Sequence, residues 1–125
     1  RKWSFGLNGP ANSTAAIRAD GTLYFCGDRE LLAIEPDGTL RWLFPTSGYA
    51  YSCPAIGPDG TVYFTTVADT PSTTVDDMLY AVRLDGTLKW SYATGGMLLS
   101  NPALGPDGTV YIGSGRKPDW IGMNR

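Results

Sequence analysis

Residues 100–113, SNPALGPDGTVYIG, are nearly duplicated at residues 52–65, SCPAIGPDGTVYFT. A weaker copy, STAAIRADGTLYFC, occupies residues 13–26. A second phrase follows two of the copies: it reads LLAIEPDGTLRWLF at residues 31–44 and LYAVRLDGTLKWSY at residues 79–92. The chain is therefore built from an internal repeat, and the repeat unit predicts the architecture.

The spacing of the copies gives the length of the unit. Asp20, Asp59 and Asp107 hold the same place in successive copies and are 39 and 48 residues apart. The longer unit contains a polar run, VADTPSTTVDD, at residues 67–77. A period near 40 with two hairpin signals is typical of a four-stranded propeller blade, whereas a helical repeat needs apolar residues three and four apart. The sequence predicts an all-β protein made of four-stranded antiparallel blades.

Each unit carries its own turn chemistry. In Pro-Asp-Gly, the proline fixes φ, the aspartate tolerates the next position and the glycine takes the left-handed conformation that closes a hairpin. A calcium loop would need several oxygen ligands at alternating positions ending in Glu, and these segments lack them. We therefore expect hairpin turns at Asp20-Gly21, Asp37-Gly38, Asp59-Gly60, Asp85-Gly86 and Asp107-Gly108.

The apolar pattern differs between strands. In residues 40–44 the alternation places Leu40, Trp42 and Phe44 on one buried face, and residues 88–92 repeat it. The strands at 22–26, 61–65 and 109–113 do not alternate clearly, which is expected of a strand packed between two neighbouring sheets. We expect these three strands to be interior.

The 125 residues divide into repeat units as one propeller segment. Residues 1–5, RKWSF, align with residues 88–92 and predict the last strand of a preceding blade. The predicted parts are residues 1–11 (that strand and a linker), 12–51 (a blade), 52–99 (a blade with an insertion at 67–77) and 100–125 (a partial blade of three strands).

Composition excludes several classes of function. The net charge is only −2 and no basic run is present, so we expect neither nucleic acid nor an anionic membrane as a partner. No apolar stretch is long enough to cross a bilayer, and the start of the chain lacks the apolar region of a signal peptide. Since the first residue is Arg1, we expect a processed or excised piece.

The two phrases, SxPAIGPDGTVYxG and LYAVxxDGTLKWSY, resemble the PQQ-like β-propeller repeat, and the resemblance covers essentially the whole chain. This is the blade type of quinoprotein alcohol dehydrogenases and of a bacterial outer-membrane assembly lipoprotein. The resemblance implies that three tryptophans, Trp3, Trp42 and Trp90, pack between adjacent blades, although simple buried aromatics would lie in nearly the same places. It also favours a periplasmic or extracellular location.

The quinone chemistry of that family does not follow from its repeat. Its dehydrogenases hold PQQ beneath a disulfide between adjacent cysteines, with a calcium ion and a catalytic Asp, whereas Cys26 and Cys53 are neither adjacent nor equivalent. We expect both cysteines to be buried free thiols, and a disulfide between them is the alternative. Without histidine, Ser-His-Asp, Cys-His and most zinc sites are excluded.

We assign no chemical role to the other candidate groups. The stretches TGGM and GSGRK lack the strand-to-helix context of a phosphate loop, and Arg116 and Lys117 are expected to be solvated. Asp76 and Asp77 are expected in a solvated loop. The sequence therefore predicts no catalytic residue, no cofactor and no metal ligand.

These observations favour a non-catalytic scaffold or recognition module that binds proteins or ligands. The alternatives are a fragment of a PQQ-dependent dehydrogenase whose site lies in missing blades, and a ligand-sensing extracytoplasmic domain of a larger receptor or kinase. Three blades cannot close a ring, because propellers use four to eight. Either two chains form a six-bladed homodimer, with residues 1–5 completing the last blade of the partner, or the chain closes with the absent blades of a longer protein.

Overall fold

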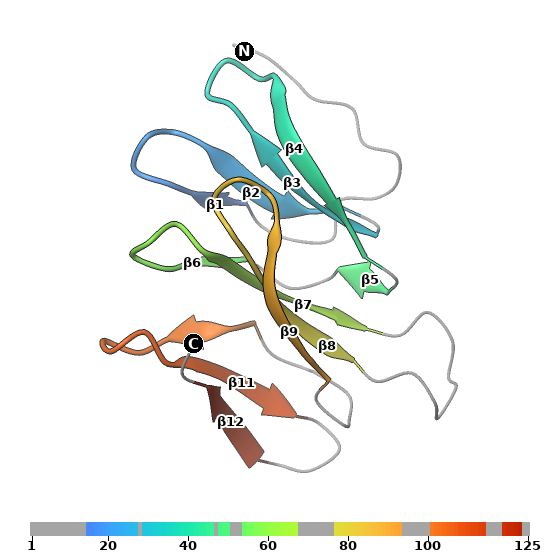
Figure 1. Ribbon diagram of the computed structural model, residues 1–125, viewed down its shortest axis with the longest axis vertical. Coiled ribbons are helices and arrows are strands. Elements are labelled where there is room, and N and C mark those ends of the chain that lie inside the picture. Colours follow the sequence, from blue (N-terminus) through green and yellow to red (C-terminus); the bar gives the residue numbers. More distant parts are fainter. Residues whose placement is uncertain are drawn as a thin grey trace.

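The computed structural model describes residues 15–27, 29–46, 48–50, 54–67, 77–93, 101–114 and 119–123, which form twelve strands in three antiparallel sheets (Figure 1). The first sheet contains, in order, β1 (Ala16–Ile17), β2 (Leu23–Cys26), β3 (Glu30–Ile34) and β4 (Leu40–Pro45). The second contains β5 (Tyr49–Ala50), β6 (Ala55–Ile56), β7 (Val62–Val67), β8 (Met78–Val82) and β9 (Leu88–Ala93). The third contains β10 (Ala103–Leu104), β11 (Val110–Ser114) and β12 (Asp119–Met123). The prediction of an all-β fold built from four-stranded antiparallel sheets is confirmed. The first sheet has four strands, β5 and β6 share one position beside β7 in the second, and three strands of the third are described.

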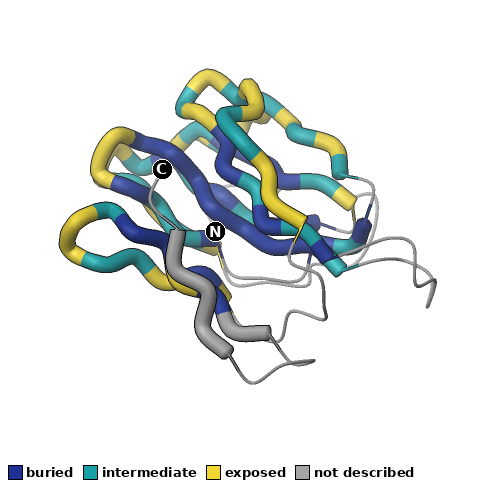
Figure 2. Tube along the Cα trace, turned by 60° about the horizontal axis from the view of Figure 1, so that its bottom comes forward, coloured by how far each residue is buried: buried dark blue, intermediate teal, exposed yellow. Residues whose placement is uncertain are grey.

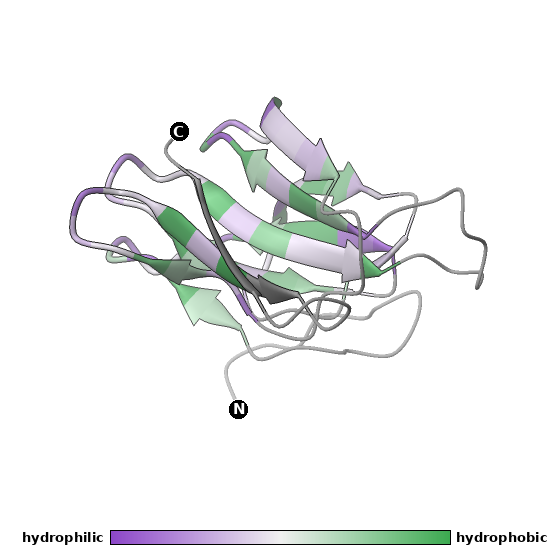
Figure 3. Ribbon diagram, turned by 90° about the horizontal axis from the view of Figure 1, so that it is seen from below, coloured by the Kyte–Doolittle hydropathy of each residue, from purple (hydrophilic) through white to green (hydrophobic). Residues whose placement is uncertain are grey.

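The sheets form successive layers with a hydrophobic core at each of the two junctions. Tyr24 and Cys26 of the first sheet pack in one cluster with Val62 and Phe64 of the second. A second cluster joins the second sheet to the third and contains Tyr63, Leu79, Ala81, Val110 and Ile112. The buried residues follow the inner strands, whereas exposed residues lie at the hairpin turns and along the outer strands β4 and β9, and the turns are hydrophilic (Figures 2 and 3). Within the described ranges, no helix has the length and apolar character needed to cross a membrane.

The inner edge of the second sheet is interrupted. Both β5 and β6 pair with β7, at opposite ends of that strand. A Cβ on Gly48 would collide with the carbonyl oxygen of Val67, so the close approach of β5 to β7 requires glycine. Tyr49–Ala50 therefore belongs to the second sheet, although the sequence placed residues 12–51 in the preceding blade.

The expectation that all three strands after the first turns are interior is correct only for β7. Residues 62–66 of β7 are all buried, whereas burial alternates along β2 and Tyr111 of β11 is 41% exposed. The second sheet has a sheet packed on each face, but within the described residues the first and third sheets have one packed neighbour each. Burial of both faces thus depends on position in the stack.

The outer strands also depart from simple alternation. Leu40, Leu88 and Tyr92 were expected on a buried face with the tryptophans, but they are 45%, 43% and 39% exposed, and Trp42 and Trp90 are only partly buried. The register shifts between Ala33 and Ile34 in the first sheet, and again between Ala81 and Val82 in the second. A β-bulge at this point turns the first leucine of each outer strand away from the core.

The first and last residues of the insertion predicted at residues 67–77 lie in described segments. Val67 is the last residue of β7 and pairs with Tyr49, and Asp77 is buried rather than solvated as expected, with 8% of its surface exposed. Its predicted neighbour Asp76 lies outside the described residues. A change to the insertion should therefore spare Val67 and Asp77.

Shortening residues 68–76 to a brief linker should change the free energy of unfolding by less than about 1 kcal/mol, because the entropy of loop closure varies only logarithmically with length. Urea denaturation monitored by tryptophan fluorescence measures the change. A loss of several kcal/mol would instead show that the segment packs against the sheets.

Candidate functional site

Five Asp-Gly turns each join two neighbouring antiparallel strands, either the first strand of a sheet to the second or the third to the fourth. Because the strands are antiparallel, all of these turns lie at the same end of the sheets. Their glycines, Gly21, Gly38, Gly60, Gly86 and Gly108, have φ between +85° and +94°. Each glycine N–H donates to the carbonyl three residues earlier, at 2.9–3.1 Å. In every turn the Asp Oδ1 accepts the N–H of the following Thr at 3.0 Å. We call this end of the sheets the turn edge.

The turn hydrogen bonds lower the pKa of these carboxyl groups. For Asp59 the N–H and hydroxyl of Thr61 are the main causes and Lys89 adds to them, so the pKa falls from 3.8 to about 2. The pKa of each of the other four aspartates is also lowered, mainly by the Thr two residues later. The carboxylates are therefore ionised at neutral pH and held in turns, which makes them poor proton donors.

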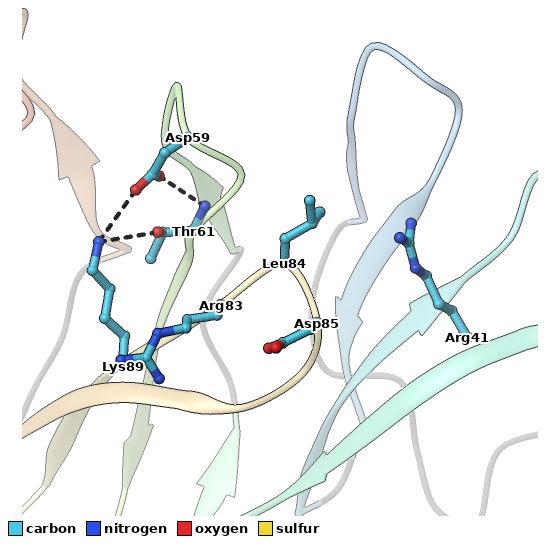
Figure 4. Close-up of a pocket in the computed structure, with 7 residues that line it drawn as sticks. All are labelled: Arg41, Asp59, Thr61, Arg83, Leu84, Asp85 and Lys89. Carbon is cyan, nitrogen blue, oxygen red and sulfur yellow. Dashed lines mark hydrogen bonds and ion pairs between the residues drawn. The ribbon is translucent and has the colours of Figure 1, made fainter.

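An open pocket of about 420 Å³ lies at the turn edge (Figure 4). Arg41 comes from β4 of the first sheet, and the rest of the lining comes from the two turns and the outer strand of the second sheet. The lining residues are Arg41, Asp59, Thr61, Arg83, Leu84, Asp85 and Lys89. Leu84 and Asp85 lie on the turn between the side chains of Arg83 and Arg41 (Figure 4).

Three cations in the pocket differ in how they are neutralised. Lys89 Nζ lies 3.2 Å from Asp59 Oδ2, and it donates to Thr61 Oγ1 at 3.4 Å. Arg41 Nε lies 3.6 Å from a carboxylate oxygen of Glu35. Within the described part of the chain, Arg83 donates to a hydroxyl and a carbonyl, those of Thr87 and Leu88. The charge of Arg83 also contributes to the lowered pKa of Asp85, which lines the same pocket.

The depressed pKa of Asp59 has a consequence for stability. A carboxylate whose pKa is lower in the folded than in the unfolded chain stabilises the fold above pH 4, and this contribution is lost as the pH falls toward 2. We expect Asp59→Asn, which keeps an oxygen for the turn, to be less stable than the parent at pH 7, and the difference to disappear as the pH falls through 2. Urea titrations across this range measure the difference. A difference independent of pH would contradict the assigned cause.

Trp42 and Trp90 lie at the two junctions between the described sheets. Trp42 Nε1 donates to the carbonyl of Leu84 in the next sheet at 3.0 Å, and its ring packs on Tyr24 with centroids 5.9 Å apart. Trp90 makes the same ring contact with Tyr63, but its buried Nε1 has no acceptor within the described residues. Trp3 lies outside the described residues.

The remaining predicted positions do not assemble into a site. Cys26 is fully buried in the first core, and Cys53 lies outside the described residues, as do Arg116 and Lys117. Sequence reasoning missed the pocket, because Arg41 meets the turn of the next unit only when the two sheets stack. The repeated cation at Arg41 and Lys89 was the available signal.

Comparisons with known proteins give a fold but no family. No protein-family model matches the sequence, and no curated protein sequence matches it. Among solved structures, BamB from Moraxella catarrhalis is similar, with 22% identity over 90% of this chain and a TM-score of 0.68. A protein of unknown function from Bacteroides caccae is similar over 98% of this chain, with 14% identity and a TM-score of 0.68.

This chain spans 33% of the BamB chain and 47% of the Bacteroides caccae chain. Likeness at these identities shows the fold, which is that of a β-propeller built from four-stranded blades.

Proposed function

We propose that this chain is a β-propeller module that binds other proteins at its turn edge and has no catalysis of its own. One observation carries the proposal: the turn-edge carboxylates of the described residues are engaged in closing hairpins. Asp59 and Asp85 accept from the threonines of their own turns, at 3.0 Å from the backbone N–H in each case. Carboxylates that are held in turns by these hydrogen bonds form a rigid surface.

The two arginines of the turn edge suit recognition, because their ion pairs lie at the exposed rim of the pocket and can be exchanged for contacts with a partner. Arg41 and Arg83 come from adjacent sheets and flank one turn. Arginine is enriched in protein interfaces because its guanidinium forms several directed hydrogen bonds. The hairpins that present these groups are fixed by packed sheets, so little entropy is lost when a partner is bound.

The proposed site of action is periplasmic or extracellular, as in the propellers that the repeat resembles.

The proposal is tested against the enzymatic alternative with PQQ and calcium. We expect no shift in the absorption spectrum of the quinone and no dye-linked alcohol oxidation when the folded chain is added. The same chain unfolded in urea serves as the matched control. A spectral shift together with alcohol oxidation by the folded chain would contradict the proposal in favour of a quinoprotein fragment.

We propose that the three described sheets belong to a larger closed ring, because propellers use four to eight blades. We propose that a second copy supplies the other blades and that the assembly is a six-bladed homodimer. Each copy would contribute residues 1–5 as the fourth strand of the last blade of the other. The alternative is closure by further blades of a longer chain.

A further inference from the structure

The turn-edge pocket differs in charge from the equivalent part of the first sheet. In the first sheet, Glu35 precedes the second Asp-Gly turn and Arg41 follows it, and Arg41 Nε lies 3.6 Å from a carboxylate oxygen of Glu35. In the second sheet the equivalent residues are Arg83 and Lys89, each 48 positions later. Two cations therefore replace the ion pair of the first sheet, because an arginine stands where the first sheet has an acid.

The two cations of the second sheet contact different groups. Lys89 Nζ lies 3.2 Å from Asp59 Oδ2, at the first turn of the sheet. The guanidinium of Arg83 donates to the Thr87 hydroxyl at 3.5 Å and to the Leu88 carbonyl at 2.5 Å. Within the described ranges, Lys89 is therefore paired with a carboxylate, whereas Arg83 is hydrogen-bonded to neutral groups.

Asp85 offsets the charge of Arg83 only at the exposed surface. Its Oδ1 accepts the N–H and the hydroxyl of Thr87 at 3.0 and 2.6 Å, and these bonds lower the pKa of Asp85 more than the charge of Arg83 does. Arg83 and Asp85 are both exposed, and exposed charge pairs contribute little because water screens them. A carboxylate of a partner can therefore pair with Arg83 without breaking a buried contact.

Arg41 brings a second cation to the pocket from the adjacent sheet. Figure 4 shows Arg83 and Arg41 on opposite sides of the turn that carries Leu84. Arg41 is also exposed, so its ion pair with Glu35 can be exchanged for a contact with a partner. Leu84 is half-buried, and it places an apolar surface between the two positive charges.

We infer that the pocket binds an acidic segment of a partner protein, with one carboxylate on Arg83, a second on Arg41 and an apolar side chain on Leu84. A guanidinium holds a carboxylate through two parallel hydrogen bonds, which give direction as well as affinity. The aspartates of other turns, Asp37 and Asp107, repel an acidic segment, so they confine it to the pocket. The inference rests on the proposed function and adds the chemistry of the partner.

The test is an NMR titration of the isotope-labelled full chain with a capped peptide, EELEE, which carries glutamates on both sides of a leucine. The amides of residues 83–86 should shift, and the lysine peptide KKLKK should leave them unchanged. Arg83→Gln and Arg41→Gln should each raise the dissociation constant of EELEE at least about tenfold, because each removes one charge-assisted pair. Added salt should weaken the binding of EELEE to the parent.

Two further variants separate the effect of the pocket from the effects of net charge and misfolding. Arg18→Gln also removes a positive charge from the turn edge, but Arg18 pairs with Asp20 and does not line the pocket. It should change the dissociation constant less than about twofold, because solvent and salt screen a charge outside the site. Arg83→Glu gives the second sheet the acid and the cation that already form an ion pair in the first, so it should fold but no longer bind EELEE. Circular dichroism checks the folding of each variant.

The inference would be overturned if the parent did not bind EELEE, if it bound KKLKK as well, or if Arg83→Gln and Arg18→Gln weakened binding equally. A single-stranded oligonucleotide of equal charge is titrated in parallel. Binding of that oligonucleotide with the same affinity would also overturn the inference, because the pocket would then select negative charge alone. These outcomes concern the acidic partner only, since the proposed absence of catalysis is judged by PQQ absorption and alcohol oxidation.

Discussion

Trp42→Ala should lower the free energy of unfolding by about 3 kcal/mol, near the low end for a large aromatic, because Trp42 is only partly buried where it packs against the first core. The indole packs on Tyr24 within its own sheet and on Gly86 in the next, and its N–H donates to Leu84 at 3.0 Å. Truncation therefore removes apolar contact on both sides of the junction and leaves a carbonyl without its donor. Urea denaturation monitored by circular dichroism measures the loss.

A conservative variant separates packing from hydrogen bonding. Trp42→Phe keeps most of the ring but removes the N–H, so it should cost only about 1–2 kcal/mol. Leu40→Ala, two residues earlier on an exposed position, should cost less than about 0.5 kcal/mol. A loss below about 1 kcal/mol for Trp42→Ala would mean that this tryptophan does not hold the two sheets together.

Gly86→Ala should cost about 2–4 kcal/mol, from two causes that add. The glycine has φ of +90°, and an alanine there carries a left-handed penalty of about 1 kcal/mol. Its Cβ would also lie 2.8 Å from Cγ of Trp42, and overpacking of this kind costs about 1–3 kcal/mol.

Gly60→Ala is the matched control for this substitution. Gly60 has φ of +87°, but its Cβ would meet the flexible end of Leu84 at 3.3 Å, which can move aside. It should therefore pay the left-handed penalty of about 1 kcal/mol alone. Equal losses for the two glycines would show that the contact between Gly86 and Trp42 carries no strain.

Features encoded within a few residues could be predicted from the sequence. Pro-Asp-Gly and its variants indicate hairpin turns because each residue type suits its own backbone conformation, and the period of the repeat then gives four strands per sheet. The same repeat pattern predicts the polar hairpin turns and the apolar strands between them. The all-β fold is the part of the prediction that local chemistry determines.

Features that depend on stacking could not be predicted in this way. Similar strands have different burial: β7 is interior because it has two neighbouring sheets, whereas Tyr111 of β11 remains exposed. The bulges that expose Leu40 and Leu88 leave no mark in the apolar alternation. The pocket needs Arg41 of one unit beside the turn of the next, a relation that no single unit contains.

The docking of adjacent sheets through Trp42 is tested most directly by a double-mutant cycle between Trp42 and Gly86. In the Trp42→Ala background the obstructing ring is absent, so Gly86→Ala should cost only the left-handed penalty of about 1 kcal/mol. The account predicts a coupling free energy of about 1–3 kcal/mol between the two positions. Additive effects, within about 0.5 kcal/mol, would contradict the contact and with it the stacking of these sheets as adjacent blades.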